Sequence, residues 1–399
     1  MRKLRKYLYI YIVIYFGLEA FFLRNEINNI QTIFNKLKKH KHLNFYRNYI
    51  NYCKKLKRFN NNKKIFNNYP FLSVCITVYN LQNYIEQALL SVLNQSFQDY
   101  EIIIINDFST DNTYNIIRRF QKEDKRIRIF NHMNNLGTYH SRVDAVLNSR
   151  GNYILFLDID DMILNPNLFE ILHYYYLYYN LDIIEFTVYH QIEEKNYLFY
   201  PNDHFNNHNH KYKKKIIYQP ELSNIIFYEP NTNNNNFVIC RTLWNKLFKK
   251  KILLKSIKYI GKEYYQKYYI IVVEDTLLNV INFHFSNNYT NINIPGYMYN
   301  IRKFSISHNK INKRDFILES ISFYLYFKLL FKYIKDYNKD INYLYYELKY
   351  CGIFMMNLKK YNIKEYIQKI KKLFYEILND KRASIKLKNL IEKLNIELK

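Results

Sequence analysis

The segment 153–162 constrains the fold of this chain more than any other stretch. It reads Tyr-Ile-Leu-Phe-Leu-Asp-Ile-Asp-Asp-Met, so an apolar run ends abruptly in Asp158, Asp160 and Asp161. A short aromatic and aliphatic run of this kind is typical of a buried strand. Three carboxylates at its end repel one another unless a cation or hydrogen-bond donors compensate. The segment therefore predicts either a site for Mg²⁺ or Mn²⁺, or a polar turn whose aspartates cap the next helix.

Strands and helices alternate around this segment. The predicted order is strand 71–78, helix 80–94, strand 101–105, helix 111–122, strand 126–130, helix 138–147, strand 153–157, helix 168–179 and strand 183–189. We expect Ser109 or Thr110 to cap the helix that follows them. Such short alternation predicts a mostly parallel sheet flanked by helices. Ligands of these sheets bind beyond the carboxyl ends of the strands, where 78–80, Asp107 and 158–161 lie.

Glycine and cysteine usage excludes several classes of site. The chain has six glycines, and no two are close enough for a dinucleotide fingerprint or a phosphate-binding glycine loop. A phosphorylated ligand would therefore be held by a metal ion and basic side chains. The four cysteines are far apart, which excludes a cysteine zinc motif and a disulfide framework and indicates a reducing compartment.

The charge of the chain is strongly positive, with a formal net charge of +26. Such a surface attracts anionic membranes, nucleotides or nucleic acid, although solvated lysine faces on helices give the same composition. The sequence contains no recognisable nucleic-acid-binding module, so we expect no nucleic-acid partner.

Three regions are predicted: a basic extension at 1–69, a catalytic domain at 70–310 and a helical region at 311–399 with lysines on its polar faces. The apolar run 7–23 is interrupted by Gly17 and Glu19 and is marginal for a membrane span. It is a membrane-surface segment, a weak anchor or a small β-hairpin. We favour a segment that packs on the protein or lies on a membrane surface.

Two further clusters carry ionisable side chains. His204, His208 and His210 could bind a metal ion, but their polar Asn- and Lys-rich setting favours a surface loop. Glu274 and Asp275 open an apolar helix after the run 270–273. They act either through the helix dipole or as carboxylates aimed into the acceptor side of a cleft.

The order of these motifs resembles that of family 2 glycosyltransferases with the GT-A fold, over 70–309 and most strongly over 70–165. Four blocks match in order: 71–80, which ends in Tyr-Asn; 106–113, similar to Asp-Asp-Gly-Ser-x-Asp; 135–142, similar to Asn-x-Gly with a downstream Arg; and 153–161, similar to Asp-x-Asp followed by another Asp. The blocks 244–250, 274–275 and 302–307 look like the C-terminal half of bacterial surface-glycan members.

The resemblance implies a role for each matching residue. Thr77, Tyr79 and Asn80 would line the nucleotide pocket. Asp107 would contact the base, Arg142 would hold the nucleotide side, and Asp158 would bind ribose or metal-linked water. Asp160 would ligate Mn²⁺ or Mg²⁺, and Asp275 would be the catalytic base with Glu274 beside it. Asn106 and Phe108 depart from the Asp and Gly of the family block, which leaves base selectivity open. Val143 stands where many members carry Asn.

The resemblance also implies a reaction and partners. The expected enzyme is a metal-dependent inverting glycosyltransferase that moves a sugar from a nucleotide sugar, typically a UDP-sugar, to a glycan or lipid-linked acceptor. It would build cell-surface polysaccharide in the cytoplasm, as a peripheral protein at the inner membrane face.

Two alternatives stay open from the sequence. A nucleotidyltransferase on a related sheet would need a glycine-rich first loop, which 78–83 lacks. A basic membrane- or nucleic-acid-binding protein with a degenerate transferase domain would bind polyanions with steep salt dependence and no nucleotide selectivity.

Overall fold

The structure is a computed structural model that describes residues 69–192, 197–199, 216–222, 242–262, 264, 270, 273–301, 313–341, 343–345, 347–348, 359 and 361–398. The expectations for the run 7–23, for His204, His208 and His210, and for the loop 302–307 lie outside the described residues. The predicted boundaries at 69 and 310 remain predictions.

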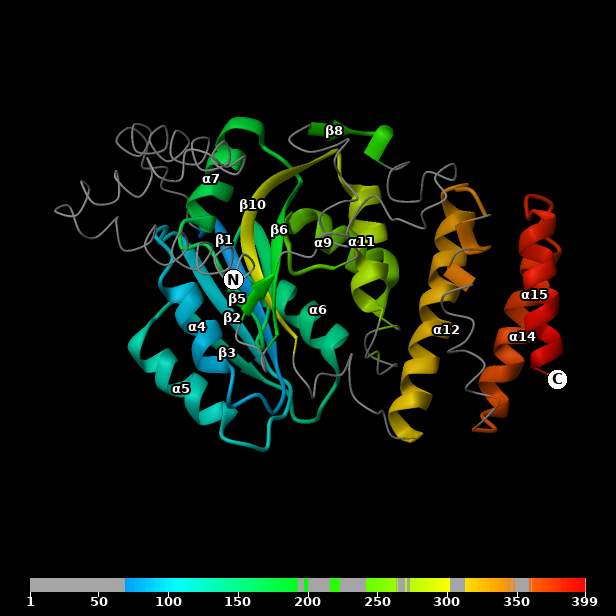
Figure 1. Cartoon of the computed structure of the whole chain (residues 1–399), viewed down its shortest axis with the longest axis horizontal. Coiled ribbons are helices and arrows are strands. Elements are labelled where there is room, and N and C mark those ends of the chain that lie inside the picture. The colour runs from blue at the N-terminus through cyan, green and yellow to red at the C-terminus, as the bar shows by residue number, and fades with distance from the viewer. Residues whose placement is uncertain are drawn as a thin grey trace, which may run out of the picture. The chain divides into compact units, whose positions relative to one another are not determined.

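A mixed sheet flanked by helices forms the core (Figure 1). The strands are β1 (Leu72–Val78), β2 (Tyr100–Asn106), β3 (Ile127–Asn131), β4 (Tyr153–Asp158), β5 (Met162–Ile163), β6 (Ile183–Ile192), β7 (Tyr197–Phe199), β8 (Ile216–Tyr218), β9 (Lys246–Lys249) and β10 (Asn288–Ile301). The main strand order is β3-β2-β1-β4-β9-β6-β10-β5. β1 to β4 run parallel, β9 is antiparallel to β4 and β6, and β10 is parallel to β6. The predicted fold class is confirmed.

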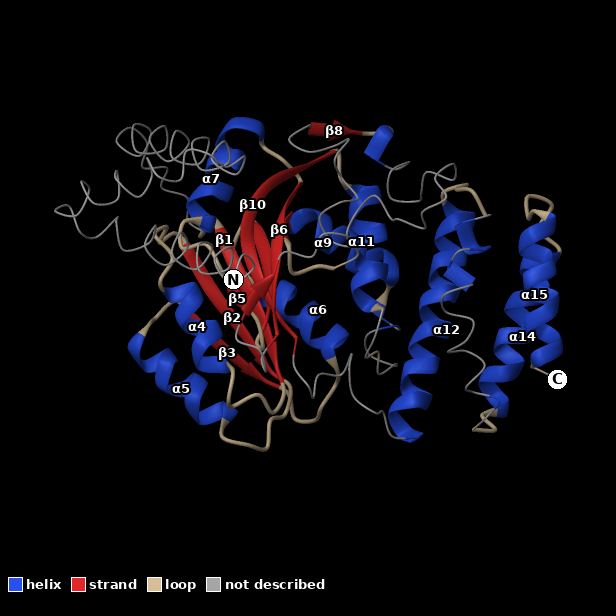
Figure 2. Ribbon diagram, in the orientation of Figure 1, coloured by secondary structure: helices blue, strands red, loops and turns tan. Residues whose placement is uncertain are grey.

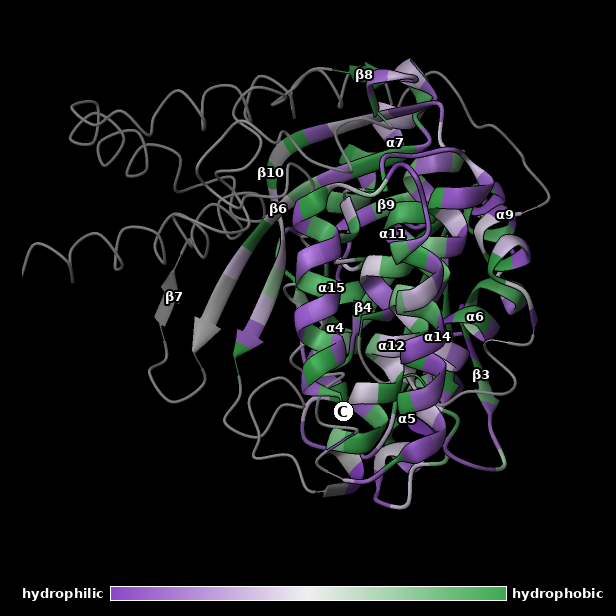
Figure 3. Ribbon diagram, turned by 90° about the vertical axis from the view of Figure 1, so that its right-hand side faces the viewer, coloured by the Kyte–Doolittle hydropathy of each residue, from purple (hydrophilic) through white to green (hydrophobic). Residues whose placement is uncertain are grey.

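Helices cover both faces of the sheet (Figure 2). They are α4 (Ile85–Leu93), α5 (Thr113–Glu123), α6 (Thr138–Asn148), α7 (Leu168–Tyr179), α9 (Lys250–Ile260), α11 (Glu274–Phe285), α12 (Lys313–Asp336), α14 (Lys364–Leu378) and α15 (Ile385–Glu397). In Figure 1, α4 and α5 lie on one side of the sheet and α6, α9 and α11 on the other. Figure 3 shows polar and apolar residues alternating along α14 and α15, as expected for amphipathic helices.

The register of the parallel strands places the predicted site residues at one edge. β1 and β2 are buried along nearly their whole length because apolar side chains face helices on both sides. Thr77 pairs with Asp158 of β4, and Val78 pairs with Asn106 of β2. The carboxyl ends of these three strands therefore meet at the same level, which sequence periodicity could not establish.

The capping role predicted for Ser109 and Thr110 is wrong. α5 begins at Thr113, whose backbone N donates to Asp111 Oδ1 at 3.0 Å. Ser109 Oγ instead accepts from the backbone N of Asn80 at 3.1 Å, and the Thr110 backbone N donates to Asn80 Oδ1 at 2.8 Å. These hydrogen bonds join the loop after β1 to the loop after β2, at the edge where the site lies.

The sequence did not predict the strands β5 and β9, nor the first part of β10, which begins at Asn288. β5 has two residues and β9 is a four-residue strand with lysine at both ends, so neither has a periodic apolar pattern. In β10, Pro295 lies at a register shift against β6, which interrupts the alternation that identifies a strand.

None of the helices in the described ranges combines the length and apolarity that crossing a bilayer requires. The C-terminal helices join the main hydrophobic core instead. Phe327 and Leu330 of α12 and Phe374 of α14 are fully buried in the same cluster as Ile281 of α11.

His173 of α7 sits in an aromatic cluster. Its ring centroid lies 4.8 Å from that of Phe71 and 4.7 Å from that of Phe97. Burial disfavours the imidazolium and lowers the pKa of His173 to about 4. The neutral ring therefore belongs to the hydrophobic packing of α7 against the sheet.

This burial predicts an acid-sensitive contribution to stability. As the pH falls from about 6.5 towards about 4, the unfolded chain binds a proton at His173 before the folded chain does. The free energy of unfolding should decrease over this window in the unmodified protein and decrease less in His173→Phe, which keeps an aromatic ring. Urea unfolding at several pH values measures the difference. Parallel pH profiles for the two proteins would contradict it.

Candidate active site

A buried guanidinium stands at the centre of the site. Arg142 projects from α6, and only 4% of its surface is exposed. Its Nη2 donates to Asp158 Oδ1 at 2.8 Å, and its Nη1 donates to Glu274 Oε1 at 2.8 Å and to Asp275 Oδ1. Burial opposes the charged form, but attraction by Asp275, Asp158 and Glu274 outweighs it and raises the pKa of Arg142. The arginine thus joins the end of β4 to the start of α11, 116 residues further along the chain than Asp158.

The acidic pair of α11 has two members in different surroundings. The side chain of Glu274 is 9% exposed, and that of Asp275 is 22% exposed. Burial, reinforced by Asp275, raises the pKa of Glu274 to about 7 against the opposing effect of Arg142. Burial also raises the pKa of Asp275, with Arg142 opposing it. Carboxylates with raised pKa values can accept protons near neutral pH, which is what general-base chemistry needs.

The residue before this pair is held in an unusual conformation. Val273 precedes α11 with a φ of 59°, in the left-handed region that β-branched residues avoid. Asp275 Oδ2 accepts a 3.3 Å hydrogen bond from the backbone N of Leu243, which helps to hold the start of the helix in place. Local backbone strain of this kind is found preferentially at functional sites.

The three aspartates after β4 divide into two kinds. Asp161 is 1% exposed, and its oxygens accept from the Tyr297 hydroxyl at 2.9 Å and from the backbone N of Asn300 at 2.8 Å. Burial, then Asp160 and Asp158, raise its pKa well above the ordinary range. Asp161 therefore anchors β10 to the end of β4, and the less buried Asp158 and Asp160 remain at the edge of the sheet.

The alternative in which the aspartates cap the next helix is wrong. α7 begins at Leu168, and its N-cap residue, Asn167, makes no side-chain capping hydrogen bond. The backbone N of Asp161 donates to the Asp158 carbonyl at 3.0 Å, so the acidic segment closes its own turn.

Asp107 is more deeply buried than we would expect for a residue that contacts a nucleotide base. It is 4% exposed, and its oxygens accept from the backbone N atoms of Leu136 and Gly137, both at 2.8 Å, and bond His132 Nδ1 at 2.7 Å. Asp107 thus holds the loop that leads into α6, where Gly137 has a φ of 88°. Its contact with a base stays a prediction.

The residues predicted at the end of β1 lie near the surface. Thr77 is partly buried and lies in register with Asp158. Tyr79 is 45% exposed, and Asn80 is exposed with a φ of 52°. Phe108, at the position of the family's glycine, has a φ of 66° and is 47% exposed. The glycine-like conformation is therefore retained without glycine, at a steric cost.

An aromatic stack lies next to the acidic segment. The indole of Trp244 stacks on Tyr297, with centroids 4.6 Å apart at 22°, and on Tyr299, with centroids 5.5 Å apart at 8°. The Tyr297 hydroxyl accepts from the backbone N of Asp158 at 3.1 Å. Sequence reasoning assigned no site role to Tyr297 or Asn300, since no local motif links them to a strand about 140 residues earlier.

The donor set after β4 suits a hard divalent cation. Asp158 and Asp160 offer carboxylate oxygens, and Mg²⁺ in proteins is usually held by one or two carboxylates together with substrate phosphates and water. Asp158 Oδ1 accepts from Arg142, so a cation would be held through the other oxygen of Asp158 together with the Asp160 carboxylate. The residues fit such an ion, but its binding stays a prediction.

Comparison with known proteins agrees with this architecture. Residues 73–253 match the family described as glycosyl transferase family 2. An uncharacterized glycosyltransferase of Haemophilus influenzae is 42% identical over 101 residues, 25% of this chain and 40% of that protein. Glycosyltransferase GlyA of Streptococcus pneumoniae is 29% identical over 236 residues, 59% of this chain and 31% of that protein. The chain spans less than half of the length of these relatives.

A third relative and a solved structure extend the comparison. The GalNAc(5)-diNAcBac-PP-undecaprenol beta-1,3-glucosyltransferase of Campylobacter jejuni is 36% identical over 100 residues, 25% of this chain and 32% of that protein. The crystal structure of S. aureus TarS 1-349 in complex with UDP-GlcNAc superposes with a TM-score of 0.53 and 16% identity, over 82% of this chain and 88% of that one.

Taken together, the sheet, its flanking helices and the acidic strand end define a mixed α/β protein of the GT-A type. Residues 73–253 form a domain of glycosyl transferase family 2.

The arrangement predicts a large cost for removing the central arginine. In Arg142→Met, Asp158, Glu274 and Asp275 lose their cationic partner, and breaking a buried pair in this way costs about 3–5 kcal/mol. Denaturant unfolding at pH 7.5 should show this loss, and a smaller one at pH 5, where protonation relieves the carboxylates. Arg118→Met, on the exposed face of α5, is the matched control. A loss of less than about 1 kcal/mol in Arg142→Met, equal to the control, would contradict the arrangement.

Proposed function

We propose that this chain is a metal-dependent inverting glycosyltransferase that moves a sugar from a nucleotide sugar, a UDP-sugar, to a hydroxyl group of a glycan or lipid-linked acceptor. The observation that carries the proposal is the contact of Arg142 with both Asp158 and Asp275. One side chain thereby links the acid at the end of β4, on the donor side, to the acid at the start of α11, on the acceptor side.

The donor side is assigned to the ends of β1, β2 and β4. Thr77, Tyr79 and Asn80 lie beside the end of β4, where the nucleotide would enter. Carboxylates outnumber the guanidinium here, so an anionic diphosphate would be repelled without added positive charge. A divalent cation held by Asp160 and Asp158 would supply that charge and stabilise the departing nucleoside diphosphate. The UDP-GlcNAc named for the TarS structure supports a uridine nucleotide as the donor class.

The acceptor side is assigned to the start of α11. Asp275 is the better candidate for the base, because its side chain is 22% exposed and that of Glu274 is 9% exposed. Asp275 would take the proton of the acceptor hydroxyl as that oxygen attacks the anomeric carbon, which is general-base catalysis. Attack from the face opposite the leaving diphosphate inverts the anomeric centre in one step.

Arg142 has a positioning role in this scheme. Its attraction counteracts the effect of burial on Asp275, and so keeps more of that carboxylate deprotonated at neutral pH. It also fixes the carboxylate relative to Asp158. The base is therefore ionised and oriented before an acceptor arrives.

The biological setting is part of the proposal. Relatives named for teichuronic acid biosynthesis and for glucosyl transfer to an undecaprenol-linked glycan support a role in cell-surface polysaccharide synthesis. A net charge of +26 supports peripheral contact with the anionic inner face of the cytoplasmic membrane. The intact acids and their ordered contacts disfavour a degenerate binding domain, and a nucleotidyltransferase would need the glycine-rich loop that 78–83 lacks.

The assignment of Asp275 as the base predicts a large loss of activity when this carboxylate is replaced. Asp275→Asn removes the proton acceptor and keeps the shape of the side chain, so release of UDP from a panel of UDP-sugars, in the presence of Mn²⁺ and membrane glycolipid, should fall at least about 100-fold. UDP binding, measured by calorimetry, should change less than about 3-fold.

The control for this experiment is Glu86→Gln on the exposed face of α4, which should retain full activity. Turnover by Asp275→Asn within a few fold of the unmodified enzyme would remove this residue from the base role. Loss of UDP binding together with turnover would mean that Asp275 supports the fold of the donor site.

A further inference from the structure

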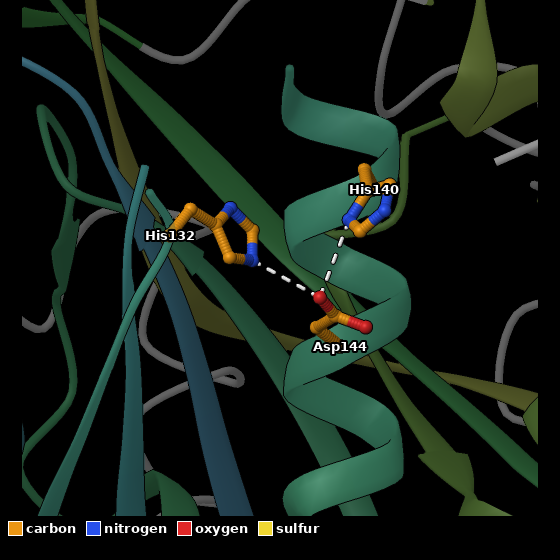
Figure 4. Close-up of side chains that lie close together, drawn as sticks. All are labelled: His132, His140 and Asp144. Atoms are coloured by element: carbon orange, nitrogen blue, oxygen red, sulfur yellow. Dashed lines mark hydrogen bonds and ion pairs between the residues drawn. The ribbon is translucent and has the colours of Figure 1, made fainter. Parts of the chain in front are cut away.

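A second group of potential metal ligands lies away from the β4 acids. It consists of His132, directly after β3, and of His140 and Asp144, one turn apart on α6 (Figure 4). Among the residues that the structure describes, it is the one group of three such side chains whose ligand atoms all lie within 4.8 Å of one another. Figure 4 shows both imidazole rings facing the Asp144 carboxylate.

The distances within the group match those between ligands of one small metal ion. His132 Nε2 lies 3.0 Å and His140 Nδ1 lies 3.2 Å from the same oxygen, Oδ2 of Asp144. In a tetrahedral zinc site with bonds of about 2.0–2.1 Å, two ligand atoms are about 3.3 Å apart. A metal ion can therefore be placed among these atoms with small side-chain movements.

The orientation of His132 is fixed by a carboxylate outside the group. Its Nδ1 bonds Asp107 Oδ1 at 2.7 Å, and its backbone N donates to the Asn106 carbonyl at 3.0 Å. When Nδ1 keeps its proton and donates it in a hydrogen bond to Asp107, the lone pair of Nε2 points towards Asp144. A histidine that ligates a metal commonly donates its other ring N–H to a carboxylate in this way.

The group is sheltered but reachable from solvent. The side chains of His132, His140 and Asp144 are 10%, 15% and 26% exposed. Two imidazoles and one carboxylate are the ligands of several catalytic zinc and non-haem iron sites, in which at least one position stays open for water. Imidazole ligands favour zinc, cobalt, nickel or iron over magnesium.

We propose that His132, His140 and Asp144 form a site for a divalent transition-metal ion, of which Zn²⁺ is the representative. This site is separate from the Mg²⁺ or Mn²⁺ proposed at Asp158 and Asp160, and it does not depend on the proposed glycosyl transfer. The ion would join the end of β3 to α6, on which Arg142 lies between the two helical ligands. It would thereby hold in place both the arginine and the loop that Asp107 organises.

In the metal-free protein the same atoms form an ion-pair network. Hydrogen bonds that His132 makes to Asp107 and then to Asp144 favour its imidazolium and raise its pKa to about 9, so that Nε2 carries a proton in this network. A metal ion at Nε2 would displace this proton, which makes the apparent affinity greater at higher pH. Binding should therefore be measured at pH 8, in buffer without chelators.

The test uses the full-length chain carrying His204→Asn, His208→Asn and His210→Asn, so that these other clustered histidines cannot contribute. Titration with Zn²⁺ in a calorimeter should give one site per chain without added nucleotide. Co²⁺ should give the visible absorption bands of a four- or five-coordinate ion with nitrogen ligands. Added Mg²⁺ at millimolar concentration should not compete.

Two variants locate the site. His140→Gln should weaken Zn²⁺ binding at least about 100-fold, whereas loss of a residue that only hydrogen-bonds to a metal ligand costs about 10–100-fold. Asp160→Ala should leave Zn²⁺ binding unchanged, which separates this site from the proposed donor-side cation. Should His140→Gln fail to fold, Asp144→Asn replaces it.

Two kinds of result would contradict the proposed metal site. Absence of a stoichiometric Zn²⁺ or Co²⁺ site in the parent chain, or unchanged affinity in His140→Gln and Asp144→Asn, would mean that the three side chains form only the ion-pair network. Loss of Zn²⁺ binding in Asp160→Ala would mean that the ion binds on the donor side. Neither result bears on the Asp275→Asn experiment.

Discussion

The ionic contacts of the buried Arg142 are the constraint on which the rest of the site depends. A guanidinium that is 4% exposed is tolerable only when carboxylates surround it, and those carboxylates come from β4 and α11. The arginine therefore requires that α6, β4 and α11 occupy fixed relative positions. The positive charge of Arg142 also reduces the repulsion among Asp158, Glu274 and Asp275, which are partly buried from water. The same contacts that stabilise the interior hold a candidate base beside a candidate donor site.

Hydrogen bonds between side chains and backbone organise the loops at this edge of the sheet. Asn80 links the loop after β1 to Ser109 and Thr110, and Asp107 holds the backbone N atoms of Leu136 and Gly137. The side chains of Asn80, Asp107 and Ser109 thus stabilise the turns at this edge by bonding backbone groups. Phe108, with a positive φ, carries a steric cost in the loop after β2, and Val273 carries a similar cost before α11.

The sequence was sufficient to predict the parallel strands, because buried runs such as 102–105 contain only apolar residues. It also identified the acids at the strand ends, since carboxylates directly after apolar strands are unusual. It could not show that Arg142 contacts Asp158 and Asp275, because such convergence depends on tertiary packing. The short strand β9 lacks any periodic pattern. It is a strand because it pairs with β4 on one side and with β6 on the other.

Other site features could not be predicted for related reasons. Ser109 looked like a helix cap, but its hydroxyl accepts from the backbone N of Asn80 in the loop after β1, which no local rule anticipates. Among the three acids of the 158–161 segment, the burial of Asp161 depends on Tyr297 and Asn300, about 140 residues away. The pairing of His132 with Asp107 and Asp144 likewise needs β3 and α6 to be placed first.

We propose that the edge of the sheet around Asp158, Asp160 and Arg142 binds a nucleotide through a divalent cation. Thermal unfolding with UDP, UDP-sugars, GDP, ADP and inorganic polyphosphate, each with and without Mn²⁺ or Mg²⁺, tests this binding. A ligand that binds only the folded state raises its stability by mass action, by about 2.7 kcal/mol at 100 times its Kd. We expect uridine nucleotides to stabilise the protein only when the metal ion is present. Equal stabilisation by every polyanion, with no effect of the metal, would contradict this expectation and would mean that the net positive charge alone accounts for binding.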